Sequence, residues 1–558
     1  MTRSAIACVI FAFITFFAVG LAAVPTDFPK IDIISLLRHI KVLSSDEFEG
    51  RAPGTEGENR TVAYIETQFK DLGLKAGNVD GTYAQRVPMI GITPDPAMTL
   101  NLREKDNPVR LTYLKDFVAW TRRTVTDTAL NDSPLLFVGY GIQAPEFSWD
   151  DYKGVDARGK TLVMLINDPP VPDPDNPARL DPKVFGGEAM TYYGRWTYKY
   201  DIGGEKGAAG VLIVHETATA GYPWSVVEGF GGERFELVSA DNNRGRSNVE
   251  GWIGLEQAKR LFAMAGQDFD VLKKEAATRA FRPVPLNVTA SIALHNTMRT
   301  IASHNVLAKL EGSKLPDEYV IYTAHWDHLG VGQPVNGDRI YHGAVDNASG
   351  VAGLIEIARA YKNLPAPPER SILFLSVTGE EQGLLGSEYY AKNPIYPLAK
   401  TLAVINMDGL NVHGRTKDIT IIGLGNSDLD DYARQAAERQ HRVLAPDPEP
   451  EKGFYYRSDH FSFAQQGVPA LNPDAGIDYV GRPADYGRQI LDDYTTNNYH
   501  KPSDVIKPDW DLSGAVEDLQ LLWMVGCEIA NSNHYPQWKP GTEFRARRES
   551  QLKAAGTK

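Results

Sequence analysis

The stretch "RSILFLSVTGEEQGLLGSEYY", residues 370 to 390, joins an apolar run to a helical pattern through two adjacent glutamates. The apolar run is short and continuous, which is typical of a buried strand. Glu380 and Glu381 follow it directly. Two neighbouring carboxylates at the mouth of a buried strand lose hydration and repel one another. The stretch therefore predicts either an acidic surface loop or a site in which the two carboxylates have different tasks.

The same alternation of strand and helix continues on both sides of this stretch, from residue 300 to residue 558. Strands are expected in "EYVIYTAHWD" and "LAVINMDG", and helices in "SGVAGLIEIARAYKNL" and "DLDDYARQAAERQ". Such alternation predicts an α/β fold with a mostly parallel central sheet and helices on both faces. In open sheets of this kind, ligands bind beyond the carboxyl ends of the strands.

The N-terminus predicts an exported protein. Arg3 precedes an almost wholly apolar run at residues 5–23, as in a secretory signal. The run is long for a signal, so an uncleaved N-terminal anchor stays open as an alternative. We expect a periplasmic or extracellular location, with no stable membrane insertion once the signal is cleaved.

The net charge and the cysteine content of the chain limit which partners the protein can bind and how its fold can be stabilised. The formal net charge of −13 argues against nucleic acid as a partner. Cys8 lies in the expected signal, and Cys527 is the only other cysteine. The mature chain is therefore expected to have no internal disulfide, which leaves core burial and bound metal to stabilise it.

Side chains suited to metal chemistry fall at the ends of the expected strands or in connecting loops. In chain order they are His325, Asp327, Asp346, Glu380, Glu381, Asp408 and His500. Imidazole and carboxylate ligands suit Zn²⁺. Two histidines and three carboxylates can hold two ions if one carboxylate bridges them.

The adjacent glutamates fit such a site because it needs one carboxylate that is not a metal ligand. A general base must take a proton from the attacking water, and a residue committed to metal cannot do so. Successive residues of an extended segment point to opposite sides. One glutamate can therefore reach the metal while the other faces the water, and metal charge would offset their repulsion.

Five motifs occur in one order: "AHWDHLG", "GAVDNASG", "GEEQGLLGS", "NMDG" and "YHKPSD". In this order they resemble the dinuclear zinc exopeptidases, a family that includes bacterial leucyl aminopeptidases and glutamate carboxypeptidase. The resemblance covers residues 27–104 and 300–530, and the segment between them looks like an inserted, β-rich protease-associated (PA) domain. The domain order it implies is a signal peptide at 1–23, the N-terminal part of the peptidase domain at 24–104, a PA-like insertion at 105–298 and the catalytic part at 299–558.

The resemblance also implies roles for individual residues. The implied ligands of two Zn²⁺ ions are His325, Asp346, Glu381, Asp408 and His500, with Asp346 as the bridge. Glu380 would be the general base, Asp327 would orient His325, and Tyr499 would help to stabilise the oxyanion.

The resemblance further implies a cis peptide bond between Asp346 and Asn347. His328 and His342 are expected to be structural, because the ligand set is complete without them. Two further stretches stay open. "SDHFSF" (458–463) is either a loop near the site or a capped helix start. "TYYGRWTYKY" (191–200) covers a pocket or packs between the domains.

The function that these features predict is a secreted zinc exopeptidase acting on peptides, and we favour an aminopeptidase because carboxylates near the metals can hold the substrate's ammonium group. A glutamate carboxypeptidase-like dipeptidase is the alternative. It would need converging arginines, and Arg457, Arg482 and Arg488 do not cluster in the sequence.

Two other functions are disfavoured. A receptor-like ectodomain would have lost ligands or the base. A one-zinc glutaminyl cyclase is disfavoured by the presence of both His325 and Asp346. The oligomeric state and the preferred peptide are not predicted by the sequence.

Overall fold

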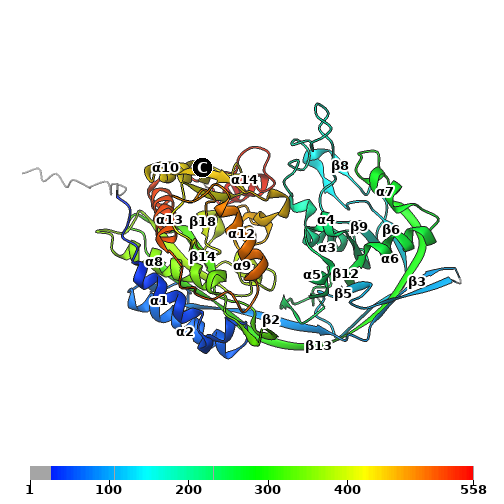
Figure 1. Cartoon of the computed structure of the whole chain (residues 1–558), viewed down its shortest axis with the longest axis horizontal. Helices are drawn as coiled ribbons and strands as arrows, with labels where there is room; N and C mark the ends of the chain where they lie inside the picture. Colours follow the sequence, from blue (N-terminus) through cyan, green and yellow to red (C-terminus); the bar gives the residue numbers. More distant parts are fainter. Residues whose placement is uncertain (1–26, 106, 230, 557–558) are drawn as a thin grey trace, which may run out of the picture.

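The computed structural model describes residues 27–105, 107–229 and 231–556, so the expected signal at 1–23 lies outside the described residues. The chain forms two parts that lie side by side, each with its own apolar core (Figure 1). The main part comprises residues 27–97 and 296–556, and the inserted part comprises residues 98–295. Strands β2 (Ala84–Pro94) and β13 (Val284–Leu310) run between them along one side. Among the described helices, none combines the length and apolar character needed to cross a bilayer.

The central sheet of the main part is mostly parallel, as predicted. Its order is β2–β13–β17–β14–β18–β21–β19–β20, and the four strands from β17 to β21 run parallel to one another. The other strands of this sheet are β14 (Leu315–His325), β17 (Arg370–Val377), β18 (Thr401–Asn406), β19 (Asp418–Ile422), β20 (Val443–Pro446) and β21 (Ala470–Asp474). The short strand β1 (Lys75–Ala76) pairs with the end of β13. Strands β15 (Gly330–Val335) and β16 (Asp338–Tyr341) form a separate hairpin.

Helices cover both faces of this sheet, which confirms the predicted fold class. The helices of the main part are α1 (Ile33–Leu43), α2 (Glu56–Asp71), α8 (Gly350–Lys362), α9 (Leu385–Lys392), α10 (Leu429–Arg439), α11 (His460–Gln465), α12 (Tyr486–Asn497), α13 (Ser513–Asn531) and α14 (Arg545–Ala554). Alternate residues of β17 point to opposite faces. Phe374 packs in the core shared with α8 and α13, whereas Leu375 packs with α9 and α11.

The inserted part has a second sheet with the order β4–β3–β13–β6–β9–β10–β12–β5, in which β6, β9, β10 and β12 are parallel. The strands of this sheet other than β13 are β3 (Thr99–Glu104), β4 (Asn107–Thr112), β5 (Phe117–Trp120), β6 (Asp127–Phe137), β9 (Thr161–Leu165), β10 (Gly210–His215) and β12 (Val249–Gly254). Strands β7 (Gln143–Ala144) and β8 (Trp149–Asp150) form a separate hairpin, and β11 (Arg234–Leu237) pairs with β2 at the edge of the central sheet. The helices of the inserted part are short: α3 (Trp196–Glu205), α4 (Thr217–Ala220), α5 (Trp224–Gly229), α6 (Leu255–Met264) and α7 (Phe269–Ala276).

Strand β13 belongs to both sheets. Its residues up to His295 pair with β6, and from Asn296 onward they pair with β2. Strand β3, which the sequence assigns to the N-terminal part of the peptidase domain, pairs with β4 and contributes Leu100 and Leu102 to the second core. The change from the first core to the second therefore falls near residue 97.

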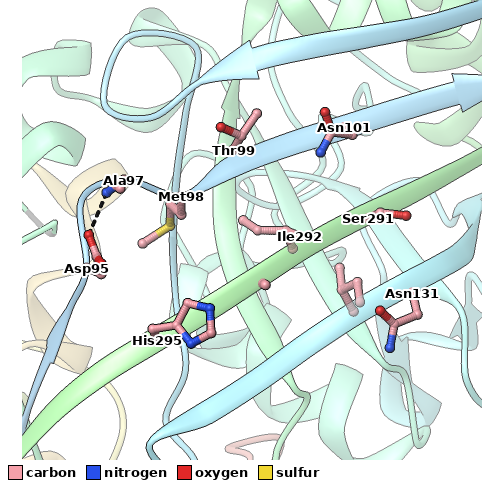
Figure 2. A pocket seen from close by; sticks show the side chains of 11 residues that line it. Asp95, Ala97, Met98, Thr99, Asn101, Asn131, Ser291, Ile292 and His295 are labelled. Carbon is pink, nitrogen blue, oxygen red and sulfur yellow. Dashed lines mark hydrogen bonds between the residues drawn. The ribbon is translucent and has the colours of Figure 1, made fainter.

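A groove of about 400 Å³ lies on the inserted part, where β3, β6 and β13 meet (Figure 2). Asp95, Met98, Asn101 and His295 are among the side chains that line it. None of the predicted site residues lines this groove.

The first helices of the chain pack onto the main part. Asp32 caps α1 by accepting hydrogen bonds from the N–H groups of Ile34 and Ser35. The apolar face of α1 contacts α8 and buries Leu36 completely, whereas Leu37 on the outer face is 39% exposed. The segment before the inserted part is therefore built into the core of the main part.

Leu36→Ala should lower the free energy of unfolding of the main part by about 2–5 kcal/mol, because it removes buried methyl groups and leaves a cavity. Leu37→Ala, the adjacent control, should change it by a small fraction of that amount. Urea unfolding followed by tryptophan fluorescence measures both. Equal effects would contradict the packing of α1.

Candidate metal centre

The predicted site residues converge at one edge of the central sheet because neighbouring parallel strands end there. His325 is the last residue of β14, Glu380 and Glu381 follow β17, and Asp408 follows β18. Asp346 lies in η4 (Ala344–Ser349), immediately before α8. The structure also brings His500, from the loop after α12, into contact with this edge.

Three of these side chains form a first group. The Nε2 atom of His325 lies 3.0 Å from Asp408 Oδ1 and 3.4 Å from Asp346 Oδ1. His325 is buried, and Asp408 is half-buried. Burial alone would lower the pKa of His325, but Asp408 and Glu380 raise it well above its ordinary value.

A second group shares Asp346 with the first. The Nε2 atom of His500 lies 3.4 Å from Asp346 Oδ2 and 3.0 Å from Glu381 Oε2. His328, which the sequence excluded as a ligand, contacts Glu381 as well, with its Nδ1 atom 2.5 Å from Oε1. The ligand atoms of His328, Asp346 and Glu381 all lie within 4.8 Å of one another. His328, which the sequence predicts to be structural, therefore lies beside the cluster in contact with Glu381.

The spacing of these atoms fits metal coordination. Zinc bonds of about 2.0–2.2 Å in tetrahedral geometry place neighbouring ligand atoms about 3.3–3.5 Å apart. The nitrogen–oxygen separations of 3.0–3.4 Å in the two groups are close to this value. Nitrogen and carboxylate donors also suit zinc chemically. The residues present thus fit the metal that the motifs imply.

The peptide bond between Asp346 and Asn347 is cis, as the motif resemblance predicted. The Asn347 side chain donates a hydrogen bond to the carbonyl of Met407, and its own oxygen accepts one from the N–H of Gly409. These bonds tie the segment of Asp346 to that of Asp408.

Glu380 stands apart from both groups. In the part of the chain that the structure describes, its carboxylate makes no hydrogen bond or ion pair, whereas Glu381 contacts His328 and His500. Burial, followed by the charges of Asp408 and Glu381, raises the pKa of Glu380 well above its ordinary value, and His325 opposes this rise. The two adjacent glutamates therefore have different surroundings.

Asp327 supports both the histidine and the glutamate pair. Its carboxylate accepts hydrogen bonds from the N–H groups of Glu380 (3.1 Å) and Glu381 (3.4 Å). His325 Nδ1 lies 3.1 Å from the Asp327 carbonyl oxygen and 3.7 Å from its carboxylate. Burial raises the pKa of Asp327 to about 8, while His325 and the Glu380 N–H act in the opposite direction.

Tyr499 lies beside the cluster, whereas His342 lies away from it. The ring of Tyr499 stacks on that of His500, with centroids 3.8 Å apart. His342 contacts the Ser44 carbonyl and Asp338, away from the cluster, as expected of a structural histidine.

The two stretches that the sequence left open also become clear. Helix α11 begins at His460 without a side-chain capping bond, and the preceding Ser458 donates a hydrogen bond to Asp408 (2.6 Å). Tyr192, at the start of the aromatic run 191–200, packs against Tyr456 and Phe461 of the main part, whereas Tyr198 and Tyr200 are buried in the core of the inserted part.

Arg51 positions the site from a loop that the sequence marked only as irregular. It is fully buried, and burial lowers its pKa to about 10. Its guanidinium donates to four carbonyl oxygens at 2.7–2.9 Å, those of Leu43, Trp326, His342 and Gly343. Two of these belong to the segment that leads into Asp346, and one follows His325 directly. A loop arginine carries no sequence signal of such burial, because its partners are backbone atoms.

Asp504 supports the same segment from the other side. Its carboxylate accepts hydrogen bonds from the N–H groups of Val345 and Asp346, each at 3.1 Å. The bridging candidate is thus held through its own backbone as well as through its carboxylate.

Arg51→Met should destabilise the protein by about 3–5 kcal/mol and weaken its retention of zinc, because four buried carbonyl oxygens lose their donor. Denaturant unfolding and metal analysis after dialysis measure the two effects. Arg38→Met is the control and should leave both unchanged, because Arg38 is exposed and, among the described residues, its side chain bonds to Ser35 alone. Normal zinc retention by Arg51→Met would contradict a positioning role.

Comparison with known proteins gives one family match. Residues 305–524 match the sequence model of peptidase family M28. The chain is 36% identical over 129 residues to aminopeptidase NAALADL1 of Mus musculus, covering 22% of this chain and 16% of that protein. It is 30% identical over 184 residues to a probable zinc metalloprotease of Pyricularia oryzae, covering 32% of each.

Two further similarities complete the comparison. The glutamate carboxypeptidase 2 homolog of Caenorhabditis elegans is 33% identical over 123 residues, covering 21% of this chain and 14% of that protein. The match thus spans only 14–32% of the length of these curated relatives. Among solved structures, an aminopeptidase from Aneurinibacillus sp. strain AM-1 is 19% identical with a TM-score of 0.49, covering 92% of this chain and 95% of that one.

Every side chain of the two groups lies within the matched region. Residues 305–524 thus match peptidase family M28, and for this region the resemblance drawn from the five motifs is confirmed.

Proposed function

We propose that this chain is an exported zinc-dependent exopeptidase that removes the N-terminal residue of peptides. One observation carries the proposal: Asp346 is common to two groups of ligand atoms, while Glu380 lies beside them without a partner in the described structure. A two-metal hydrolase needs such a bridge, together with a carboxylate free to move a proton. The names of the aminopeptidase and metalloprotease relatives agree with this chemistry.

The proposed ligands are His325, Asp346 and Asp408 for one zinc ion, and Asp346, Glu381 and His500 for the other. Bound there, the two ions would supply Lewis acidity toward water and toward the scissile carbonyl. His328 contacts Oε1 of Glu381 whereas His500 contacts Oε2, and we assign His328 the task of orienting that carboxylate.

Glu380 is the proposed general base. Its carboxylate has no partner among the described residues, whereas that of Glu381 contacts His328 and His500, so Glu380 is the one left to take a proton from the attacking water and pass it to the leaving amine. Asp327 holds the backbone of both glutamates, which keeps Glu380 aimed at the water while Glu381 stays with the metal ligands. Tyr499, stacked on His500, is the proposed donor to the developing oxyanion.

We also propose that the inserted part serves as a PA-type domain that walls one side of the active site. The Met190 N–H of the inserted part donates to the Pro450 carbonyl of the main part at 3.0 Å. Tyr192 and Tyr456 pack across the same contact. The proposed effect of this wall is to limit access to short peptides.

Glu380→Gln should abolish turnover but keep two zinc ions per chain, because the substitution removes the general base but no metal ligand. Loss of a general base typically reduces the rate by about 10²–10⁴-fold. Glu381→Gln should lose zinc as well as activity. Metal analysis and peptide hydrolysis of both variants test whether the two glutamates have these different roles, and an equal loss of zinc in both would refute it.

The amino end of the substrate should be the end that is cut, because Glu380 and Asp408 can hold a free ammonium group beside the metals. The zinc-loaded enzyme should release the first residue of a free-amine peptide, and N-acetylation of that peptide should block the reaction. Cleavage of N-acetylated dipeptides ending in glutamate, without activity on free amines, would favour the carboxypeptidase alternative.

A further inference from the structure

The outer face of helix α1 exposes three large aliphatic side chains to solvent. Ile34 is 78% exposed, Ile33 is 41% exposed and Leu37 is 39% exposed. Residues three or four positions apart are neighbours on a helix surface, so Leu37 lies next to both isoleucines. No other described helix or strand exposes as many large aliphatic side chains. Ile33, Ile34 and Leu37 thus form one apolar surface, the α1 patch.

The opposite face of α1 already provides the packing that the fold needs. Leu36, Ile40 and Leu43 are completely buried in the core of the main part, where α1 contacts α8. The α1 patch therefore adds nothing to this core. Covering one fully exposed side chain of this size favours the covered state by a factor of about 10–150. The patch thus favours contact with an apolar surface from outside the described chain.

The charged side chains of α1 are basic. Arg38 and Lys41 are exposed, and each lies four residues after a member of the α1 patch, on the same side of the helix. The helix sequence, "IISLLRHIKVL", contains no acidic residue, although the whole chain has 71 acidic and 58 basic residues. Apolar side chains flanked by lysine and arginine are typical of helices that lie in a membrane interface.

The residues before α1 indicate a bilayer as the partner. The apolar run 5–23, for which an uncleaved anchor is one of the two interpretations, lies outside the described residues. Ile33, the first residue of α1, is only ten residues beyond Ala23. An extended chain advances about 3.3–3.6 Å per residue, so this linker spans at most about 36 Å. An anchored chain would therefore keep α1 close to the bilayer surface.

The segment that leads into α1 is fixed to the main part. Gln520 of α13 donates a hydrogen bond to the Pro29 carbonyl at 2.8 Å, and Ile31 is buried in the core. The N-terminal segment and the α1 patch therefore keep a fixed relation to the rest of the main part. Helix α1 lies at the end of the molecule away from the inserted part (Figure 1). A bilayer at this end would leave the contact between the two parts open to solvent.

We propose that the α1 patch docks onto the surface of an anionic phospholipid bilayer to which residues 5–23 anchor the chain. The anchor attaches the protein, and docking of the patch fixes its orientation against the bilayer. The three aliphatic side chains would enter the interface, while Arg38 and Lys41 would contact lipid phosphate groups. Each basic residue near an anionic surface strengthens binding about fivefold. The proposal goes beyond peptide hydrolysis, and its test needs no substrate.

Thiol accessibility in the full-length chain tests the docking. Ile34→Cys is reconstituted into vesicles of phosphatidylethanolamine and phosphatidylglycerol and treated with a maleimide that cannot enter the bilayer. Val271→Cys is the matched control, because Val271 is 51% exposed on α7 of the inserted part. In vesicles, Ile34→Cys should react at least about tenfold more slowly than Val271→Cys, and in detergent the two rates should be similar. The wild-type chain gives the background from Cys8 and from Cys527, which is buried.

Reversing the basic charges should release the patch without releasing the protein. Arg38→Glu combined with Lys41→Glu should speed the labelling of Ile34→Cys about tenfold in the same vesicles, because carboxylates are repelled by anionic headgroups. Vesicles of phosphatidylcholine, which carry no net charge, should also speed it. The amount of chain in the membrane pellet should stay unchanged in both cases, because residues 5–23 are intact. Urea unfolding followed by tryptophan fluorescence checks that each variant is folded.

Several results would overturn the proposal. If Ile34→Cys reacts as fast as Val271→Cys in anionic vesicles, the patch does not dock. Protection that persists in detergent would mean that protein covers the patch, either the chain's own N-terminal residues or a second copy. Equal protection in phosphatidylcholine vesicles would rule out an anionic surface as the partner. Release of the wild-type chain from the membrane pellet by high salt would show that residues 5–23 do not anchor it.

Discussion

The accumulation of negative charge at one edge of the central sheet is the constraint on which the rest of the site depends. Five carboxylates meet there: Asp327, Asp346, Glu380, Glu381 and Asp408. In a poorly hydrated site such groups repel one another unless cations or N–H donors lie among them. His325, His328 and His500 are placed between the carboxylates, and backbone N–H groups point at Asp327. Bound metal would complete this compensation.

The same constraint explains why two buried groups outside the ligand set matter. Arg51 holds the backbone on either side of the cluster through hydrogen bonds, and its positive charge interacts favourably with Asp346. Asp504 accepts a hydrogen bond from the N–H of Asp346 and so holds the backbone of that residue in place at the sheet edge. The ligand atoms can stay 3.0–3.4 Å apart only because the loops that carry them are held by these backbone contacts.

The two parts are connected both by a shared strand and by contacts between loops. Strand β13 runs from one sheet into the other, so it couples them at one side. The contact of Met190 with Pro450 and the packing of Tyr192 on Tyr456 join them at a second place. The candidate metal ligands all belong to the main part.

The sequence by itself determined the fold class and most of the metal-binding candidates. Parallel strands end at a common edge, so polar residues placed just after "EYVIYTAH", "RSILFLSV" and "LAVIN" had to meet there whatever the details of packing. Ordered motifs then separated Glu380 from Glu381 and singled out Asp346. These are local features, and the strand and helix periodicities that position them can be seen within a few residues.

Only the tertiary structure decided the features that depend on contacts between distant segments. Arg51 binds backbone carbonyls up to 292 residues away in the chain, and such partners leave no mark on side-chain patterns. The contact of His328 with Glu381 likewise depends on how loops pack. Where one sheet gives way to the other along β13 is also a tertiary feature, because apolar alternation along a strand does not say which sheet the strand joins.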